Sequence, residues 1–240
     1  MRLLDLTLPT PAENIALDEA LLMEAEQGGR QAELLRVWEP PDPLVVVGRG
    51  SSVSREVDVE ACWSDEVPIF RRCSGGTAIV AARGCLMYAL VLCYQKRPQL
   101  RAINLAHQFV LSRMTQALSQ LAPGVQRAGT SDLALQDRKV SGNSLRCRRD
   151  FLMYHGTLLY NMPLGLIQRY LHPPPRQPDY RQGRGHDQFV TNLPLDEVAV
   201  RTALYNAWEV DEHVADWPEA CTRELVESRY TQNAWNFQRP

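Results

Sequence analysis

The most informative stretch of this sequence is Asp137-Arg138-Lys139-Val140-Ser141-Gly142-Asn143, and His155-Gly156-Thr157 follows it closely. It places a lysine between a β-prone run and a Ser-Gly step. The chain has 26 basic residues, of which only Lys96 and Lys139 are lysine. Arginine holds its proton tightly and cannot replace a compact, tunable ammonium at a reaction centre. Lys139 is therefore the first candidate for a functional residue.

Length and composition indicate an ordinary globular protein. The chain has 240 residues, 45% of them hydrophobic and 22% charged, which fits one large domain or two small ones. A net charge of −2 argues against non-specific nucleic-acid binding. The first residues lack the apolar run of a secretory signal, and no stretch approaches the length of a membrane span. We expect a cytoplasmic protein without nucleic-acid or membrane partners.

The cysteines and histidines give no sign of a metal cage. None of the six cysteines forms a C-x-x-C pair or has zinc-ligand spacing, so we expect free thiols in a reducing compartment. The five histidines are scattered. We expect no metal bound by the chain alone, although magnesium carried in by a nucleotide would leave no such motif.

Two long helices are predicted. The first begins at the capping box Thr10-Pro11-Ala12-Glu13 and is expected to end at Gly28-Gly29. The second runs over residues 101–121 and ends at Pro123-Gly124. The apolar face of this second helix is predicted to comprise Ile103, His107, Val110, Leu111, Met114, Leu118 and Leu121.

Short β-prone runs surround these helices. Strands are predicted at residues 34–38, 44–47, 69–71, 77–80, 86–93, 131–135, 139–144 and 154–160. Shorter helices are predicted at residues 164–170, 194–208 and 218–230, and the Pro- and Gly-rich segment 173–185 is predicted to be a mobile loop. Strands grouped around single long helices favour an α+β sandwich, and the absence of a linker favours one domain.

Two glycine-containing loops could hold a ligand. In Arg71-Arg72-Cys73-Ser74-Gly75-Gly76-Thr77, the two glycines let the backbone approach a ligand closely, and the arginines suit phosphate or carboxylate. In Val47-Gly48-Arg49-Gly50, an apolar strand breaks into a similar loop. Neither loop matches the P-loop or the dinucleotide-binding pattern, so neither is specific by itself.

The order of these motifs along the chain is far more specific. The blocks are Asn14-Ile15-Ala16-Leu17-Asp18-Glu19-Ala20, Gly48-Arg49, Arg71-Arg72-Cys73-Ser74-Gly75-Gly76, Ser131-Asp132-Leu133, Arg138-Lys139-Val140-Ser141-Gly142, His155-Gly156-Thr157-Leu158-Leu159 and Val190-Thr191-Asn192-Leu193. This succession resembles the lipoate–protein ligase A family over nearly the whole chain. The octanoyltransferases are relatives in the same group, and the biotin–protein ligases are more distant ones.

The resemblance implies the fold and the site. We expect a class II synthetase-like α+β catalytic domain, with mixed and antiparallel sheets packed against helices, spanning residues 1–240. Lys139 would contact the carbonyl and phosphate oxygens of an acyl-adenylate and stabilise the developing charge. Asp132 could contact the nucleotide or its magnesium, and His155 would have a supporting role. The full set implied for acyl and adenylate binding is Arg49, Arg71, Arg72, Ser74, Gly75, Gly76, Thr77, Asp132, Ser141, Gly142, His155, Gly156 and Thr157.

The resemblance also implies the reaction. The substrates would be ATP with Mg²⁺ and lipoate or octanoate, and the acyl group would pass to a lysine of a lipoyl-carrier domain. Such carriers are the glycine cleavage H protein and the E2 components of 2-oxoacid dehydrogenases.

The sequence departs from the family pattern in two places. The family usually follows Ser-Gly-Gly with Gly, then His-Asp, then Gly-Asn, whereas this chain has Thr77, Ala81-Ala82 and Gly84-Cys85. It also ends just after Trp235-Asn236-Phe237, where two-domain ligases continue into an accessory domain. We therefore expect the catalytic domain alone, with an accessory domain on a separate protein if one is needed.

Three functions are consistent with these features. The first is an adenylate-forming lipoate–protein ligase. The second is an octanoyltransferase that works through a cysteine thioester. Its candidate nucleophile is Cys147, because the adjacent Arg146, Arg148 and Arg149 would lower the pKa of the thiol. The third is a non-catalytic protein that binds a lipoyl carrier or an acyl-adenylate, an idea motivated by Ala81-Ala82.

Overall fold

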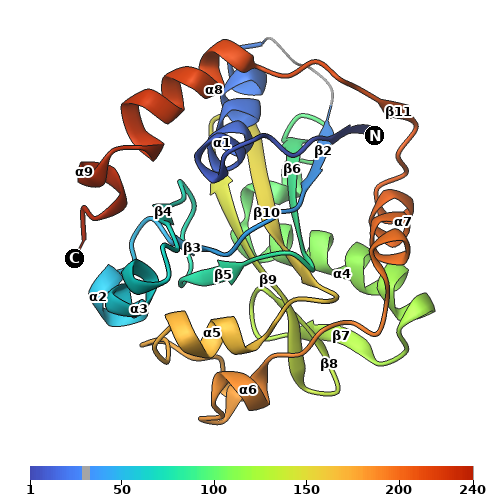
Figure 1. The fold of residues 1–240 in the computed structure, drawn as a ribbon. Helices are drawn as coiled ribbons and strands as arrows, with labels where there is room; N and C mark the ends of the chain where they lie inside the picture. The colour runs from blue at the N-terminus through green and yellow to red at the C-terminus, as the bar shows by residue number, and fades with distance from the viewer. Residues whose placement is uncertain (29–32, 240) are drawn as a thin grey trace.

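The larger of two β-sheets crosses the middle of the molecule (Figure 1). The computed structural model describes residues 1–28 and 33–239, and all structural statements below refer to these residues. Within them, the large sheet has the strand order β11 (Glu212–His213), β1 (Arg2–Asp5), β2 (Leu34–Trp38), β6 (Cys85–Cys93), β10 (Phe151–Leu159), β9 (Arg138–Cys147), β8 (Asp132–Leu135) and β7 (Val125–Ala128).

This sheet is mixed. Strand β1 runs parallel to β2 and β11, and the other neighbours are antiparallel. Every residue of β6 is buried, as expected for a central strand with both faces covered. The β9–β10 pairing sets His155 opposite Ser144 and Gly156 opposite Asn143. The two most informative sequence motifs therefore lie on adjacent strands.

The smaller sheet carries the two glycine-containing loops. Its order is β4 (Ile69–Arg71), β3 (Leu44–Val47) and β5 (Ile79–Ala81), with β3 parallel to β4 and antiparallel to β5. The Gly48-Arg49-Gly50 segment leaves the end of β3, and the segment from Arg72 to Ala78 connects β4 to β5. Both loops therefore emerge at the same end of this sheet.

The two predicted long helices cover different parts of the large sheet. Helix α1 (Pro11–Glu26) begins with the expected capping box, in which the Glu13 amide donates to the Thr10 hydroxyl at 3.3 Å and the Thr10 amide donates to the Glu13 carboxylate at 2.9 Å. In Figure 1, α1 lies near the C-terminal helix α8 (Glu219–Leu225), and α4 (Ile103–Leu121) runs near α7 (Glu197–Ala207). The remaining helical segments are α2 (Val53–Glu56), α3 (Val59–Ser64), α5 (Gly165–Tyr170), α6 (His186–Phe189), α9 (Asn233–Asn236), the 3-10 turns Pro98–Arg101 and Asp179–Arg181, and the π turn Val226–Tyr230.

Apolar clusters fill the spaces between these layers. One cluster joins the small sheet to α1 and the C-terminal segment, a second lies under α4 and α7, and a third lies under α1. Val110, Met114 and Leu118 of α4 are buried as predicted. Ile103 and Leu121, at the ends of the predicted apolar face, are 57% and 47% exposed. The α+β fold with mixed sheets packed against helices is confirmed.

Several predicted boundaries were wrong in ways that affect the site. Strand β5 begins at Ile79, because Thr77 and Ala78 belong to the loop, where the Ala78 amide donates to the Glu56 carboxylate at 2.6 Å. Strand β9 extends to Cys147, which places this cysteine at the end of the β9–β10 hairpin. The predicted loop 173–185 contains a short turn whose Arg181 is only 3% exposed. Gly28 follows α1 with a positive φ of 82°, as a helix-ending glycine does, whereas Gly29 lies outside the described residues.

A buried arginine ties the small sheet to the C-terminal segment. Arg71, at the end of β4, is 0% exposed, and its guanidinium donates to the carbonyl oxygens of Gly48 and Ser51, both at 2.8 Å. Its Nε donates to the carbonyls of Trp235 and Asn236, both at 3.2 Å. Burial lowers the pKa of Arg71, but the carbonyl dipoles compensate for the charge.

We expect Arg71→Met to lower the free energy of unfolding by about 3 kcal/mol, because it removes the guanidinium donor from several carbonyl oxygens, among them those of Ser51 and Asn236. Urea denaturation followed by far-ultraviolet circular dichroism would measure the loss. Arg83→Met, at an exposed arginine in the β5–β6 turn, is the matched control and should change stability by less than about 0.5 kcal/mol. Equal stability of the two variants would contradict a structural role for Arg71.

Candidate active site

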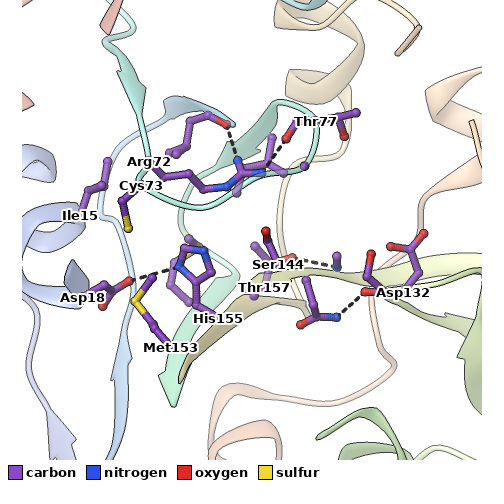
Figure 2. Close-up of a pocket in the computed structure, with 18 of the residues that line it drawn as sticks. Ile15, Asp18, Arg72, Cys73, Thr77, Asp132, Ser144, Met153, His155 and Thr157 are labelled. Atoms are coloured by element: carbon purple, nitrogen blue, oxygen red, sulfur yellow. Dashed lines mark hydrogen bonds and ion pairs between the residues drawn. The ribbon is translucent and has the colours of Figure 1, made fainter. Parts of the chain in front are cut away.

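Two hollows meet at Lys139. The first has a volume of about 100 Å³ and an apolar wall formed by Ile15, Trp38, Val46, Ile79, Met87 and Met153. The second has a volume of about 120 Å³ and an apolar wall formed by Val80, Leu159, Ile167, Leu171, Phe189 and Val190. Both are lined by Thr77, Ile79, Lys139, Gly142 and Thr157. In Figure 2, Asp18 and Met153 lie at one end of the first hollow and Asp132 lies toward the other.

An irregularity in the sheet directs Lys139 into this junction. Between β8 and β9, Ser141 pairs with Leu133 but Lys139 pairs with Ala134, so Val140 is the extra residue of a bulge. A bulge changes the direction of the neighbouring side chain. The Lys139 Nζ atom lies 2.8 Å from Asp132 Oδ1, and the Lys139 side chain is 28% exposed. The other Asp132 oxygen accepts from the Tyr180 hydroxyl at 2.8 Å. Asp132 therefore serves as the counter-ion that positions the ammonium.

Two glycines make room for this arrangement. A Cβ atom at Gly142 would lie 2.8 Å from Lys139 Nζ and would push the ammonium aside. A Cβ atom at Gly156 would collide with the Asn143 amide and lie 2.8 Å from the Gly142 carbonyl oxygen. The glycines of the Ser-Gly and His-Gly steps are therefore required by the close approach of β9 and β10 at the site.

A second buried arginine fixes the Gly75-Gly76 loop. The Arg72 guanidinium donates to the carbonyl oxygens of Gly75 at 2.5 Å, Thr77 at 3.0 Å and Val46 at 3.1 Å. Burial lowers the pKa of Arg72 to about 10, so it stays cationic. Its donors are used by the protein itself, which means that Arg72 shapes the loop more than it offers free donors to a ligand.

The two glycine-containing loops pack backbone against backbone. The Arg49 amide donates to the Ser74 carbonyl at 2.8 Å. A Cβ atom at Gly48 would overlap the Gly76 carbonyl, so only glycine fits there. Ser51 and Ser144 donate to the carbonyls of Gly76 and Gly75, both at 3.0 Å. Hydrogen bonds from Arg49 and Ser51 on one side and from Ser144 on the other therefore hold the Gly75-Gly76 loop in place.

The structure brings together most, but not all, of the residues that the sequence implied. Those that line the first hollow are Arg72, Gly76, Thr77, Asp132, Lys139, Gly142, His155, Gly156 and Thr157. Those that line neither hollow are Arg49, Arg71, Ser74, Gly75 and Ser141. Ser141 is a buried residue of β9, and its hydroxyl accepts from the side-chain amide of Asn143 at 3.1 Å. Arg71 faces the backbone carbonyls described above. Direct ligand contact by either group stays a prediction.

Sequence reasoning missed a buried polar group at the far end of the first hollow. Asp18 on α1 forms an ion pair with Arg36 on β2 at 2.5 Å, and its other oxygen lies 3.8 Å from His155 Nδ1. The His155 Nε2 atom lies 2.5 Å from the Ser74 hydroxyl. The separation between His155 and Asp18 exceeds that of a hydrogen bond, and Ser74 does not line the hollow. We therefore interpret this serine, histidine and aspartate as support for the loop and not as a nucleophilic triad.

The departures from the family pattern lie away from both hollows. Ala81, Ala82 and Cys85 are 0%, 3% and 0% exposed and belong to the apolar cluster between the small sheet and α1. None of them lines either hollow. These replacements therefore lie in the apolar core and not at the wall of either hollow.

Cys147 is exposed at the hairpin end and lines neither hollow. Of its arginine neighbours, Arg149 pairs with Asp150 at 2.8 Å, and Arg148 lies 3.9 Å from Glu19. The structure therefore places this thiol apart from Lys139.

Among the described residues, no group of three or more His, Cys, Asp or Glu side chains is arranged to hold a metal ion. No helix in residues 1–28 or 33–239 has the length and apolar character of a membrane span.

The fold and the site together define an α+β domain with a lysine where two hollows meet. Comparison with known families is more specific. The model of the lipoyl protein ligase A/B catalytic domain matches residues 10–202, and the chain belongs to this family.

Individual relatives agree with this assignment. A candidate lipoate–protein ligase A of Aeropyrum pernix is 32% identical over 164 residues, which cover 68% of this chain and 59% of that protein. A bi-partite lipoate–protein ligase of Thermoplasma acidophilum, studied with its E2 lipoyl domain, has a TM-score of 0.80 at 20% identity, covering 98% of this chain and 95% of that one. A lipoate–protein ligase A with bound ATP has a TM-score of 0.79 at 21% identity, covering 98% of both chains. At such identities the structural likeness shows the fold, and the chain spans just over half of the Aeropyrum pernix relative.

The buried ion pair between Asp18 and Arg36 generates a test of stability against pH. Burial raises the pKa of Asp18, but Arg36 and His155 outweigh it, and the net pKa lies below the ordinary value of 3.8. A depressed pKa in the folded state stabilises the protein above the ordinary pKa, and this stabilisation is lost as the pH falls through the folded-state value. We expect Asp18→Asn to cost about 3 kcal/mol at pH 7, because it leaves Arg36 buried without its carboxylate.

Urea denaturation of wild type and Asp18→Asn at pH 7 and at pH 3 would measure this difference. The two proteins should differ less at pH 3, because the Asp18 carboxyl of the unfolded wild type binds a proton below its ordinary pKa of 3.8, and part of the stabilisation is then lost. Glu13→Gln at the start of α1 is the control for a more exposed carboxylate on the same helix. A difference that is constant across pH would contradict the ionised state assigned to Asp18.

Proposed function

We propose that this chain is the catalytic domain of an ATP-dependent lipoate–protein ligase. The observation that supports it most is the junction of two hollows at Lys139, because adenylation must bring an acyl carboxylate and a nucleotide phosphate to one point. Residues 1–240 would act as one domain. An accessory-domain protein would be a separate partner.

The proposed reaction has two steps. In the first, a lipoate carboxylate oxygen attacks the α-phosphorus of ATP, giving lipoyl-adenylate and releasing pyrophosphate. In the second, the neutral amine of a target lysine attacks the acyl carbonyl, an amide forms, AMP leaves, and the amine loses a proton. Lys139 would stabilise negative charge on the carbonyl and phosphate oxygens in both steps. Asp132 would hold its ammonium in place between them.

The first hollow suits the acyl chain. Its wall is mostly apolar, and the polar junction with Lys139 lies where the carboxylate of the acid would be activated. The same wall would accept the hydrocarbon part of octanoate. Lipoate is our proposal for the natural acid, and octanoate is the alternative acyl group for the same chemistry.

The second hollow suits the nucleotide. Leu159, Phe189 and Val190 offer an apolar wall to a planar base, and Arg176 adds a cation for phosphate. Both oxygens of Asp132 are already bonded, to Lys139 and Tyr180. With no carboxylate cluster in the described part of the chain, Mg²⁺ would be held mainly by the phosphates of ATP, where it would neutralise their charge.

The acceptor would be a lipoyl-carrier domain. The similar Thermoplasma acidophilum ligase was studied with its E2 lipoyl domain, which supports an acceptor of this kind. An E2-type domain is our first proposal and the glycine cleavage H protein is the second. The non-catalytic alternative loses its motivation, because Ala81 and Ala82 lie in the core and not beside the hollows.

We expect Lys139→Ala to reduce lipoate-dependent ATP–pyrophosphate exchange by at least about 100-fold, because it removes the cation at the junction. Exchange of radiolabelled pyrophosphate into ATP measures the first step directly. The chain supplies an ideal control, Lys96→Ala, since Lys96 is its other lysine, is exposed and lines neither hollow. Wild-type exchange in Lys139→Ala would contradict the role of Lys139. No exchange in wild type, alone or with an accessory-domain protein, would contradict the proposed ligase.

We expect Cys147→Ser to transfer lipoate to an E2-type lipoyl domain at a rate within about twofold of wild type, because an adenylate needs no thiol nucleophile. Intact-mass spectrometry of the enzyme after incubation with acyl donor should show no covalent acyl adduct. Cys221→Ser provides the control for loss of another accessible thiol. An adduct on wild type that disappears in Cys147→Ser, together with loss of transfer, would establish the octanoyltransferase mechanism instead.

A further inference from the structure

Five arginines surround the outer side of the Gly75-Gly76 loop. They line two open hollows that lie beyond the acyl and nucleotide hollows. The third hollow is lined by Gly50, Ser51, Ser52, Arg55, Glu56, Gly75, Gly76, Thr77, Pro175, Arg176 and Arg239. The fourth is lined by Arg49, Gly50, Cys73, Ser74, Gly75, Ile103, Leu145, Arg146, Cys147, Gln238 and Arg239. We call Arg49, Arg55, Arg146, Arg176 and Arg239 the arginine rim.

The arginine rim differs in its ion pairing from other arginines in the described part of the chain. Elsewhere, arginines commonly pair with carboxylates, as Arg97 does with Glu33 at 2.9 Å and Arg201 with Asp5 at 2.9 Å. Within residues 1–28 and 33–239, no rim arginine forms an ion pair. The Nε atom of Arg146 is buried without any hydrogen-bond partner. The one carboxylate in the third hollow, Glu56, accepts from the Ala78 amide at 2.6 Å.

This concentration of positive charge is local. The chain as a whole has a net charge of −2, so the rim is not part of a generally basic surface. Four of the five arginines are exposed, and the fourth hollow also contains Ile103, which is 57% exposed. Exposed cations around a small apolar centre are typical of a protein-binding surface with a charged rim. An acidic protein surface would complement it.

The third hollow adjoins the junction at Lys139. Thr77 lines the first, second and third hollows, so the rim lies beside the place where the acyl group would be activated. A target lysine reaches an acyl carbonyl only by the length of its four-carbon stem. An acceptor whose amine enters from this side would therefore rest its surface on the rim.

We propose that the arginine rim is the docking surface for an acidic face of the acceptor domain, around its target lysine. This inference rests on the proposed ligase function and adds the recognition of its protein substrate. The rim would steer the acceptor toward the opening by long-range attraction, which raises the association rate and weakens as salt is added.

Arg176 also lines the nucleotide hollow, so the test must use other arginines of the rim. Arg146 lines only the fourth hollow, and Arg239 lines both outer hollows but neither inner one. The double variant Arg146→Glu/Arg239→Glu reverses two rim charges without touching the acyl or nucleotide hollow. Arg83→Glu, in the exposed β5–β6 turn, is the matched control for reversing an arginine charge elsewhere.

The experiment separates the two steps of the reaction. Transfer to an unlipoylated E2-type lipoyl domain is measured with preformed lipoyl-adenylate at low and high salt, and ATP–pyrophosphate exchange is measured without acceptor. We expect the double variant to lose at least about 10-fold in kcat/KM for the acceptor at low salt, with a flatter salt dependence. Exchange should stay within about twofold of wild type, which also shows that the variant is folded.

Reversal of charge on the acceptor provides a second experiment. An acceptor in which acidic residues flanking the target lysine are replaced by lysine should be modified faster by the double variant than by wild type. Unchanged transfer in the double variant would overturn the docking surface and leave the ligase intact. Loss of exchange together with transfer would show that the rim acts on the nucleotide, which also overturns it. Failure of wild type in both assays would contradict the proposed function itself.

Discussion

Burial of two consecutive guanidinium groups is the constraint on which the site depends. A buried cation is costly unless each of its N–H groups finds an acceptor. Arg71 and Arg72 find theirs mostly among backbone carbonyls, chiefly those of the loops after β3 and β4. Arg71 fixes the segment after β3 against the C-terminal turn, and Arg72 fixes the Gly75-Gly76 loop. The buried charges and the carbonyl dipoles of these loops thus stabilise each other.

The position of Lys139 relative to Thr77 follows from this constraint. Thr77 lies on the loop that Arg72 holds, and Lys139 lies on β9 at the bulge, so two separate sheets set the width of the junction. Ser144 on β9 also donates to the Gly75 carbonyl at 3.0 Å, which links the loop to the strand that carries Lys139. A site assembled in this way is rigid before any ligand arrives, as electrostatic stabilisation of a transition state requires.

Local sequence signals predicted the elements that depend on neighbouring residues. Elements and side-chain pairs that depend on contacts between distant segments were missed. The capping box at Thr10 and the apolar face of α4 depend on neighbouring residues, so their patterns could be read directly. Strand β1 spans only four residues and is ordered by β2 and β11, which its own sequence cannot reveal. Asp18 has the sequence context of an ordinary helix carboxylate, but α1 is covered on several sides and its partner Arg36 comes from β2. A common site for Lys139 and His155, which line one hollow, was implied by the family resemblance and not by periodicity.

The contrast between arginine and lysine in this chain has a physical basis. Arginine presents five donors in a fixed plane, which suits a buried group that must satisfy several carbonyls, as Arg71 and Arg72 do. The space beside the ammonium of Lys139 is tight on the side of Gly142, because a single Cβ atom there would come within 2.8 Å of Nζ. A compact cation fits between Asp132 and Gly142 while still facing both hollows. Steric space as well as charge therefore favours a lysine at this point of an arginine-rich protein.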